Sequence, residues 1–394
     1  MHHADPIDFD EGRIILTLRA QPVDLQAAFL MERLGLMEVQ TSTQLKWNDY
    51  AIGSQALLLG NLGVAEVAPT PKQRELLRAF AAGDPAAQES LGPWLEGAEP
   101  DEAFVAAAYG DDGVASWGIH ATRAVSSALT GAGVRVAILD TGLPTGHAAF
   151  GGRIRSAESF VPGLSANDSV SGHGLACAGI AAGGRMPADG RRIGVATEAD
   201  IYIGRVLGNN ARGMKSWTLR GISWALQKEC RVVSMSLASP KPGTSTSPAF
   251  ERAGQRAVES GALLIAAAGN YPEGSFVGEP ANANLIIAVG AVDSGLNPLP
   301  FSPQSDPARP GAAIDFVGPG HDILSFGLTA VSTRFRGTSM ATAYVAGLAA
   351  LHVQASRLAG VPAYGMDLKT RIAASFVHAN GPVERVGRGL VVAP

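Results

Sequence analysis

Four short segments of the chain carry side chains that could together perform nucleophilic catalysis. Asp140 ends an apolar run and His173 stands between two glycines. Ser339 opens a stretch rich in alanine and glycine, and Asn270 follows a run of small residues. A hydroxyl becomes a nucleophile when an imidazole takes its proton and a carboxylate orients that imidazole. A neutral amide can hold the negative oxygen that forms during acyl transfer.

Each of these residues also has a simpler interpretation. An aspartate can end a strand without any role in chemistry, and a lone histidine is commonly a satisfied core or loop residue. A serine frequently caps a helix, and an asparagine after glycine is usually found in a turn. A helix cap explains Ser339 but leaves the run Gly-Thr-Ser-Met-Ala at residues 337–341 unexplained. The combination of the four residues, rather than any one of them, indicates catalysis.

The four segments together resemble the subtilisin-like serine protease family. The chain order Asp, His, Ser is the one that distinguishes this family from chymotrypsin-like enzymes and α/β-hydrolases. The motifs lie at residues 136–142, 171–179, 266–270 and 336–348. The resemblance implies a serine endopeptidase in which Ser339 attacks the scissile carbonyl, His173 transfers the proton and Asp140 fixes the imidazole. It also implies that Asn270 and the backbone N–H of Ser339 hold the oxyanion.

The same resemblance assigns the walls of a substrate pocket to residues that carry no charge. These residues are Ser236, Leu237, Ala238, Ala267, Ala268 and Gly269. We therefore expect an apolar side chain such as Leu or Met before the scissile bond. Three positions depart from the family pattern: Ala238 replaces a usual glycine, Leu175 a usual threonine, and Tyr271 a usual small or acidic residue. Pro280 corresponds to a cis proline that borders the pocket in the family.

After Trp117, apolar runs alternate with helical stretches, and these predict the strands and helices that position the candidate residues. Continuous apolar strands separated by helices predict an α/β fold, a mostly parallel sheet with helices on both faces. Functional groups of such folds lie beyond the carboxyl ends of the strands. The runs expected to form strands are residues 134–139, 199–203, 231–237, 262–267 and 285–290.

The sequence predicts three regions: a small α+β domain at residues 1–82, a linker at 83–113 and the peptidase domain at 114–394. In the first region we expect a strand at 14–18, a helix that starts near Asp24, strands within 38–43 and 56–67, and a helix that starts at Pro71. Glycine, proline and acidic residues mark the linker. By element order the first region resembles the family's propeptide, which inhibits the protease intramolecularly; a permanent accessory domain is the alternative.

Composition limits the partners and the cofactors. Lysine and arginine count 31 against 35 acidic residues, which gives a net charge of −4 and no dense basic run, so nucleic acid is excluded as a partner. The two cysteines, Cys177 and Cys230, lack the spacing of zinc or redox sites. The resemblance implies no required cofactor. Calcium stays open, but the stretch 183–192, where many relatives carry a calcium loop, offers one carboxylate beside three arginines.

No apolar run reaches membrane-spanning length, and the given start lacks a signal peptide. The sequence therefore favours a cytoplasmic enzyme without a membrane partner, or a secreted one if a leader has been removed.

Two other functions fit part of the sequence. Asp140-Thr141-Gly142 and Asp293-Ser294-Gly295 satisfy the paired motif of pepsin-like aspartic proteases, which requires a two-lobed β fold. A catalytically silent relative that only binds peptides is the second alternative. Labelling by serine-reactive reagents distinguishes both from a serine peptidase.

Overall fold

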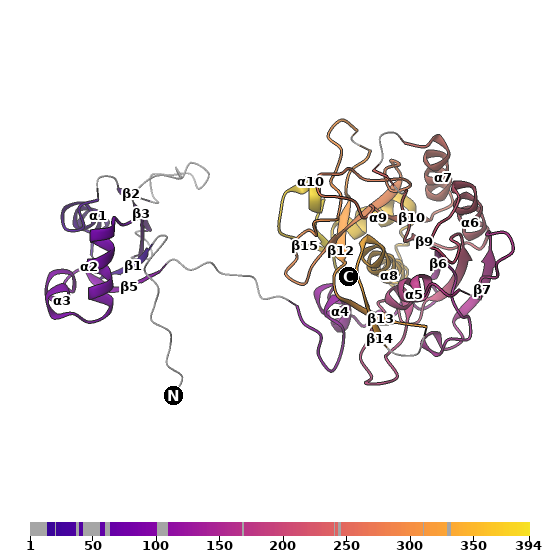
Figure 1. Cartoon of the computed structure of the whole chain (residues 1–394), viewed down its shortest axis with the longest axis horizontal. Coiled ribbons are helices and arrows are strands. Elements are labelled where there is room, and N and C mark those ends of the chain that lie inside the picture. Colours follow the sequence, from indigo (N-terminus) through magenta and orange to yellow (C-terminus); the bar gives the residue numbers. More distant parts are fainter. Residues whose placement is uncertain are drawn as a thin grey trace. The chain divides into compact units, whose positions relative to one another are not determined.

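A nine-stranded sheet organises the larger part of the chain in the computed structural model (Figure 1). The strand order is β15-β16-β12-β11-β10-β9-β6-β8-β7, and all neighbours are parallel except β15 and β16. The structure describes residues 14–19, 21–36, 39–41, 56–59, 64–100, 109–167, 169–239, 241–242, 246–309, 311–328 and 332–394. The predicted mostly parallel α/β sheet is confirmed.

The central strands match the apolar runs to within two residues at their starts and ends. They are β6 (Arg135–Asp140), β8 (Asp200–Arg205), β9 (Val232–Met235), β10 (Leu263–Ala267) and β11 (Ile286–Val292). Four further strands flank them: β7 (Ile154–Ser159), β12 (Phe316–Pro319), β15 (Phe376–Val377) and β16 (Leu390–Val391). A separate antiparallel ribbon is formed by β13 (Ile323–Phe326) and β14 (Ser332–Phe335). The flanking strands escaped prediction because they are short or, like β7, only half buried.

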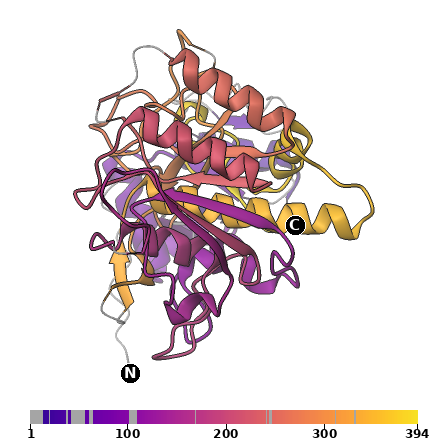
Figure 2. The same ribbon diagram turned by 90° about the vertical axis from the view of Figure 1, so that its right-hand side faces the viewer.

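Helices pack on the sheet in two groups. α5 (His173–Ala182) and α8 (Thr338–Leu358) lie against each other, and α8 also contacts β9 to β12. α6 (Lys215–Gln227) and α7 (Pro248–Glu259) form the second pair, seen side by side in Figure 2. The remaining helices are α4 (Trp117–Ala121), α9 (Gly365–Ala373) and α10 (Val383–Val386), with 3₁₀ turns η1 (Ala124–Ser126) and η2 (Ala148–Phe150).

Small residues in α8 allow this helix to run through the core. A Cβ atom on Gly347 would lie 2.6 Å from the carbonyl oxygen of Ala181 in α5, which is too close for any larger residue. The two helices can therefore approach backbone to backbone. As a result the amino ends of α5 and α8, which begin at His173 and Thr338, are held in fixed positions near the carboxyl ends of the central strands.

The chain divides into two compact units, Met1–Val105 and Ala106–Pro394. The first unit has a five-stranded sheet of order β2-β3-β4-β1-β5. Its strands are β1 (Ile14–Leu18), β2 (Val39–Thr41), β3 (Ala56–Leu59), β4 (Val64–Val67) and β5 (Leu95–Pro100), and its helices are α1 (Val23–Glu32), α2 (Pro71–Ala81) and α3 (Pro85–Leu91). This unit has its own apolar core, in which Phe29 and Trp94 stack.

The predicted linker at residues 83–113 is corrected in its first part. Asp84 accepts hydrogen bonds from the backbone N–H groups of Ala86 and Ala87, so it caps α3, and Pro85 occupies the first turn. β5 pairs antiparallel with β1. The proline and acidic residues therefore mark a helix start rather than a loop. Residues 101–108 lie outside the described residues, and Ala106 onward belongs to the second unit.

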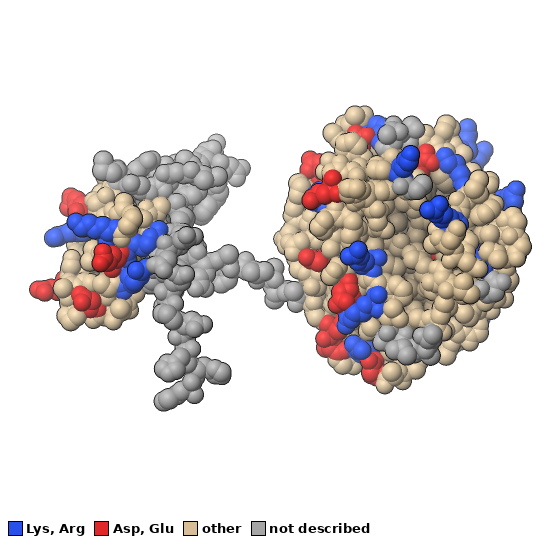
Figure 3. Space-filling view, viewed as in Figure 1, with Lys and Arg blue, Asp and Glu red and all other residues tan. Residues whose placement is uncertain are grey.

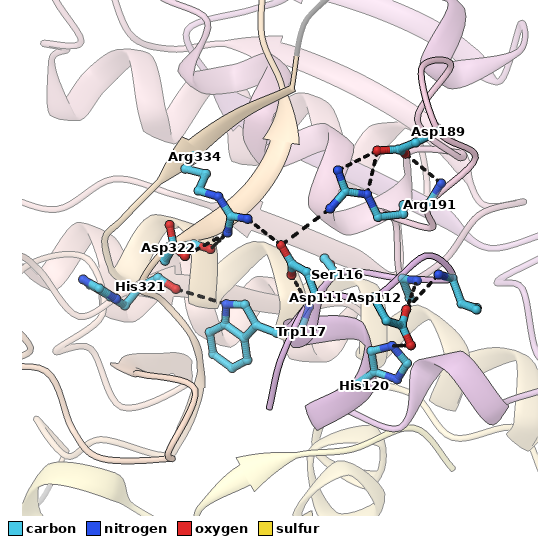
Figure 4. A network of polar contacts seen from close by, with 12 residues as sticks. Asp111, Asp112, Ser116, Trp117, His120, Asp189, Arg191, His321, Asp322 and Arg334 are labelled. Atoms are coloured by element: carbon cyan, nitrogen blue, oxygen red, sulfur yellow. Dashed lines mark hydrogen bonds and ion pairs between the residues drawn. The ribbon is translucent and has the colours of Figure 1, made fainter. Parts of the chain in front are cut away.

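Asp111 anchors the segment that leads into α4 (Figure 4). Its carboxylate accepts the backbone N–H of Trp117 at 2.7 Å and lies 2.7 Å from the guanidinium of Arg334 on β14. Arg191 is 3.8 Å away. Only 12% of the Asp111 side chain is exposed. This carboxylate thus joins three segments that are far apart in the sequence.

Charges on the surface in view in Figure 3 are mixed in sign, and the described residues on that face show no extended basic patch. No helix in the described part of the chain is long and apolar enough to cross a membrane.

Candidate active site

The carboxylate of Asp140 and the imidazole of His173 form a hydrogen-bonded pair. β6 ends at Asp140 and α5 begins at His173, so the fold brings together two residues 33 positions apart. Nδ1 of His173 lies 2.8 Å from Oδ1 and 3.0 Å from Oδ2 of Asp140. The carboxylate is buried, and its Oδ1 also accepts the backbone N–H of Thr141 at 2.6 Å. An imidazole held in this way at Nδ1 presents Nε2 for proton transfer.

Hydroxyl groups next to Asp140 support the start of α5. The Thr141 hydroxyl oxygen accepts the backbone N–H of Gly174 at 3.0 Å and the hydroxyl of Ser169 at 3.2 Å. A Cβ atom on Gly174 would lie 2.5 Å from the carbonyl oxygen of Gly142, so only glycine permits this close approach. Leu175 is fully buried in the core. The family usually has a threonine hydroxyl at the position of Leu175. In this chain the hydroxyls of Thr141 and Ser169 support the segment that begins at His173.

The electrostatics of the pair favour a charged imidazole. Burial opposes protonation of His173, but the charge and hydrogen bond of Asp140, together with Cys177, offset this effect and raise the pKa of His173 well above its ordinary value. The pair can thus accept a proton and hold it beside the carboxylate.

Ser339 lies in the first turn of α8 and exchanges hydrogen bonds with Ser236. The Ser339 hydroxyl donates to the carbonyl oxygen of Ser236 at 3.2 Å, and the Ser236 hydroxyl donates to the carbonyl oxygen of Ser339 at 2.9 Å. The Ser339 hydroxyl therefore points to the chain after β9 and not to Nε2 of His173. Such contacts are often unformed before a substrate binds. Ser339 and His173 line one pocket.

Asn270 follows β10 and is fixed by the start of α8. Its Oδ1 accepts the backbone N–H of Thr338 at 2.9 Å and the Thr338 hydroxyl at 3.2 Å. Because a backbone N–H can only donate, this contact assigns Oδ1 and leaves Nδ2 as the free donor of the amide. The N–H of Ser339 has no acceptor within the helix, since it lies in the first turn. Both residues line the same pocket, so both groups can donate to an atom bound there.

A pocket of about 610 Å³ is lined by three of the four candidate catalytic residues. Its lining includes His173, Ser339, Asn270 and three of the predicted wall residues, Ser236, Leu237 and Ala238. The other predicted wall residues are not part of the lining, because Ala267 and Ala268 are buried and Gly269 is covered by the ring of Tyr271. The bond between Glu279 and Pro280 is cis, as the resemblance implied.

One group of potential metal ligands lies within the described residues, namely Asp140, His173 and Cys177. Nδ1 of His173 is already bonded to Asp140, and the Cys177 sulfur lies 3.9 Å from the same nitrogen. Burial raises the pKa of the Cys177 thiol. A protonated thiol and a bonded imidazole are poor ligands for a metal ion.

The stretch 183–192 uses its only carboxylate internally. Asp189 accepts the backbone N–H and the guanidinium Nε of Arg191, at 3.0 and 2.7 Å. The arginine charge occupies the position that a cation would need beside this carboxylate.

The structure contradicts the aspartic-protease alternative. Asp140 pairs with an imidazole, whereas Asp293 accepts the backbone N–H groups of Gly295 and Asn297 in the turn after β11. The sheet is parallel with packed helices, and a pepsin-like site needs two β lobes. The Asp-Thr/Ser-Gly repeat is a coincidence of turn sequences.

Comparisons with known proteins identify the family. A sequence model of the subtilase family matches residues 131–379. M-protease of Shouchella clausii (strain KSM-K16) and Subtilisin Savinase of Lederbergia lenta are each 38% identical over 238 residues, or 60% of this chain. The match spans 58% of M-protease, less than two thirds of its length, and 82% of Savinase. The chain therefore belongs to the subtilase family of serine endopeptidases.

The fold is also similar to that in a crystal structure of a cold adapted subtilisin-like serine proteinase. The TM-score is 0.56 at 28% sequence identity, and the similarity covers 68% of this chain and 89% of that one. The family match begins after the first unit, which lies entirely outside it.

Proposed function

We propose that the protein hydrolyses peptide bonds with Ser339 as nucleophile, His173 as general base and acid, and Asp140 as the residue that orients the imidazole. The observation that carries this proposal is the 2.8 Å bond between Asp140 and Nδ1 of His173 at the pocket where α8 begins with Ser339. Carboxylate, imidazole and hydroxyl thus come together from β6, α5 and α8.

The reaction then proceeds in two halves. The Ser339 hydroxyl turns from Ser236 to His173, and its oxygen attacks the carbonyl carbon while Nε2 takes the proton. Nδ2 of Asn270 and the N–H of Ser339 donate to the oxygen that becomes negative. The imidazolium then protonates the leaving amine, and water repeats the sequence to release the acid from the acyl-enzyme. No cofactor takes part in these steps.

A catalytically silent peptide-binding module is the competing function. It is tested with a set of chromogenic peptides, comparing wild type with Ser339→Ala at matched circular dichroism spectra. The proposal expects hydrolysis by wild type and none by the variant. Equal turnover by both proteins would contradict the assignment of Ser339, and binding without turnover by wild type would favour the silent module.

We further propose that the first unit is a propeptide that inhibits the second. The proposal is supported by its independent core, its position before the family match and the predicted element order, which β1, α1, β3, β4 and α2 follow. The test is N-terminal sequencing of purified wild type and Ser339→Ala over time. Loss of the first unit from wild type alone, with rising activity, is expected. A full-length wild type with full activity would contradict an inhibitory role.

A further inference from the structure

We propose that Tyr271 fills the space that would receive the substrate side chain on the acyl side of the scissile bond, so that the enzyme selects a small residue there. This inference rests on the proposed peptidase function and names its substrate class: peptides with Gly, Ala or Ser before the cleaved bond. It replaces the expectation of Leu or Met, which assumed an open pocket between two uncharged walls.

Three chain segments enclose the space in question. They are the residues after β9, the residues after β10 and the segment before the cis proline. The N–H of Ser239 donates to the carbonyl of Glu279 at 2.7 Å, and the N–H of Gly278 donates to the carbonyl of Ala268 at 2.9 Å. These hydrogen bonds hold the segments at fixed spacing. Ser236, at the near end of the first segment, bonds the Ser339 hydroxyl, so the space opens beside the nucleophile.

The phenol ring of Tyr271 contacts all three segments. A Cβ atom on Gly269 would lie 2.1 Å from Cε2 of the ring, and one on Gly278 would lie 2.0 Å from the phenol oxygen. The ring thus rests directly on the backbone of both glycines. Its hydroxyl donates to the carbonyl of Ser239 at 2.7 Å. A side chain that is wedged between backbone on each side leaves no room for a second large side chain.

Burial and hydrogen bonding hold the ring in this position. Only 7% of Tyr271 is exposed, and burial raises the pKa of its phenol, so the hydroxyl stays protonated and able to donate. Its backbone N–H is bonded to the carbonyl of Phe301 at 2.9 Å. Swinging the ring out would break the bond to Ser239 and expose a large apolar surface, which is unfavourable.

The open part of the pocket lies on the side of α6 and α7. Its lining includes the apolar Leu207, Leu237 and Phe250, and Lys215 and Glu279, which form an ion pair of 2.7 Å, line the same cavity. Substrate side chains other than the one at the cleaved bond can bind there. The enzyme can therefore recognise an extended peptide while it requires a small residue at the cleaved bond.

The test compares peptide substrates that differ only in Ala or Phe before the scissile bond. For wild type, kcat/KM for the Ala peptide should exceed that for the Phe peptide by at least about 10- to 200-fold, the discrimination that a single methylene gives in an apolar pocket. Tyr271→Ala should reverse or abolish this preference. Tyr271→Phe, which keeps the ring and loses only the hydroxyl, should keep it. A wild type that prefers Phe, or a Tyr271→Ala variant with the wild-type ratio, would overturn the proposal.

Two controls separate this inference from its premises. Labelling of Ser339 by a small fluorophosphonate shows that each variant is folded and that its nucleophile is active. If wild type is labelled and prefers to cleave after Phe, only the inferred role of Tyr271 is contradicted. If wild type is neither labelled nor active, the proposed function is contradicted, and this inference with it. If Tyr271→Ala fails to fold, the bonds that wild type cleaves in a peptide library can be mapped by mass spectrometry. A predominance of Gly, Ala and Ser before the cleaved bonds supports the proposal, and a predominance of large residues there overturns it.

Discussion

Ser339 and Ser236 hold each other through two reciprocal hydrogen bonds, hydroxyl to carbonyl in both directions, at 3.2 and 2.9 Å. The start of α8 is thereby tied to the chain that leaves β9. In the proposed mechanism, this contact holds the Ser339 backbone beside the carbonyl that is attacked, and the hydroxyl turns to His173 when a substrate binds. The bond between Asp140 and His173 is formed in advance and needs no such rearrangement.

Replacement of Asp140 by Asn should reduce kcat about 10⁴-fold, because an amide can donate to Nδ1 and stabilise the wrong imidazole tautomer. The matched control is Asp293→Asn, since Asp293 lies in the second Asp-Ser/Thr-Gly segment and bonds only its own turn. Turnover of both variants is measured on one peptide. Equal losses in the two variants would revive the aspartic mechanism.

As pH rises through the pKa of His173, activity should increase and the contribution of His173 to stability should decrease. The imidazole must be neutral to act as base, and its pKa is raised, so kcat/KM should rise with pH with a midpoint above about 6.5. A folded-state pKa above the unfolded value means that the pair stabilises the fold fully below about pH 6.5, and that this contribution is lost as pH rises through the folded pKa. The pH profiles of kcat/KM and Tm, with His173→Gln as control for Tm, measure both effects. An activity maximum near pH 3 would contradict the role of His173.

Mercury bound to Cys177 should abolish peptide hydrolysis. The sulfur lies 3.9 Å from Nδ1 of His173 and 4.0 Å from the carbonyl oxygen of Ser339, so a metal atom there displaces the imidazole. Activity is measured after an organomercurial treatment, and mass spectrometry confirms the modified residue. Cys177→Ala should resist, whereas Cys230→Ala should remain sensitive. Full activity of a protein mercurated at Cys177 would contradict this geometry.

The fold and the candidate site motifs could be predicted from the sequence, whereas the packing details of the site could not. The close approach of Asp140 and His173 could be predicted because Asp140 ends a strand and His173 begins a helix in recognisable motifs, and Asn270 follows the neighbouring part of the sheet after β10. The carboxyl ends of parallel strands lie at one edge of the sheet. The helix α3 was missed because Asp84 and Pro85 suit both a cap and a loop. The position of the Tyr271 ring depends on packing against Gly278 and Ser239, contacts between segments that no local pattern encodes.

The hydrogen bonds that support the start of α5 could not be predicted from the sequence either. Thr141 stands beside Asp140 in the sequence, but its bonds to Gly174 and Ser169 follow only from the fold. A buried threonine directly after the strand-ending aspartate is the one local sign of this role.

Removal of the Asp111 carboxylate should lower Tm of the second unit without loss of activity. Asp111→Asn loses the ion pair with Arg334, in which the carboxylate is largely buried, and a loss of about 1 kcal/mol corresponds to about 2 °C in a domain of this size. Asp322→Asn is the matched control, because Asp322 binds the same arginine but is 54% exposed, and exposed pairs contribute little. Calorimetry of both variants checks the prediction. A larger shift for Asp322→Asn would show that Asp111 is not the anchor.

Covalent labelling of Ser339 tests the central claim most directly. Wild type, Ser339→Ala and His173→Ala are each treated with a fluorophosphonate, and the modified residue is identified by peptide mass spectrometry. Asn270→Ala serves as the comparison that weakens the oxyanion site but keeps the nucleophile and its base. The account predicts rapid labelling of wild type at Ser339 alone, slower labelling of Asn270→Ala, and none of the other two variants. Labelling at a different residue, or labelling of His173→Ala at the wild-type rate, would contradict it.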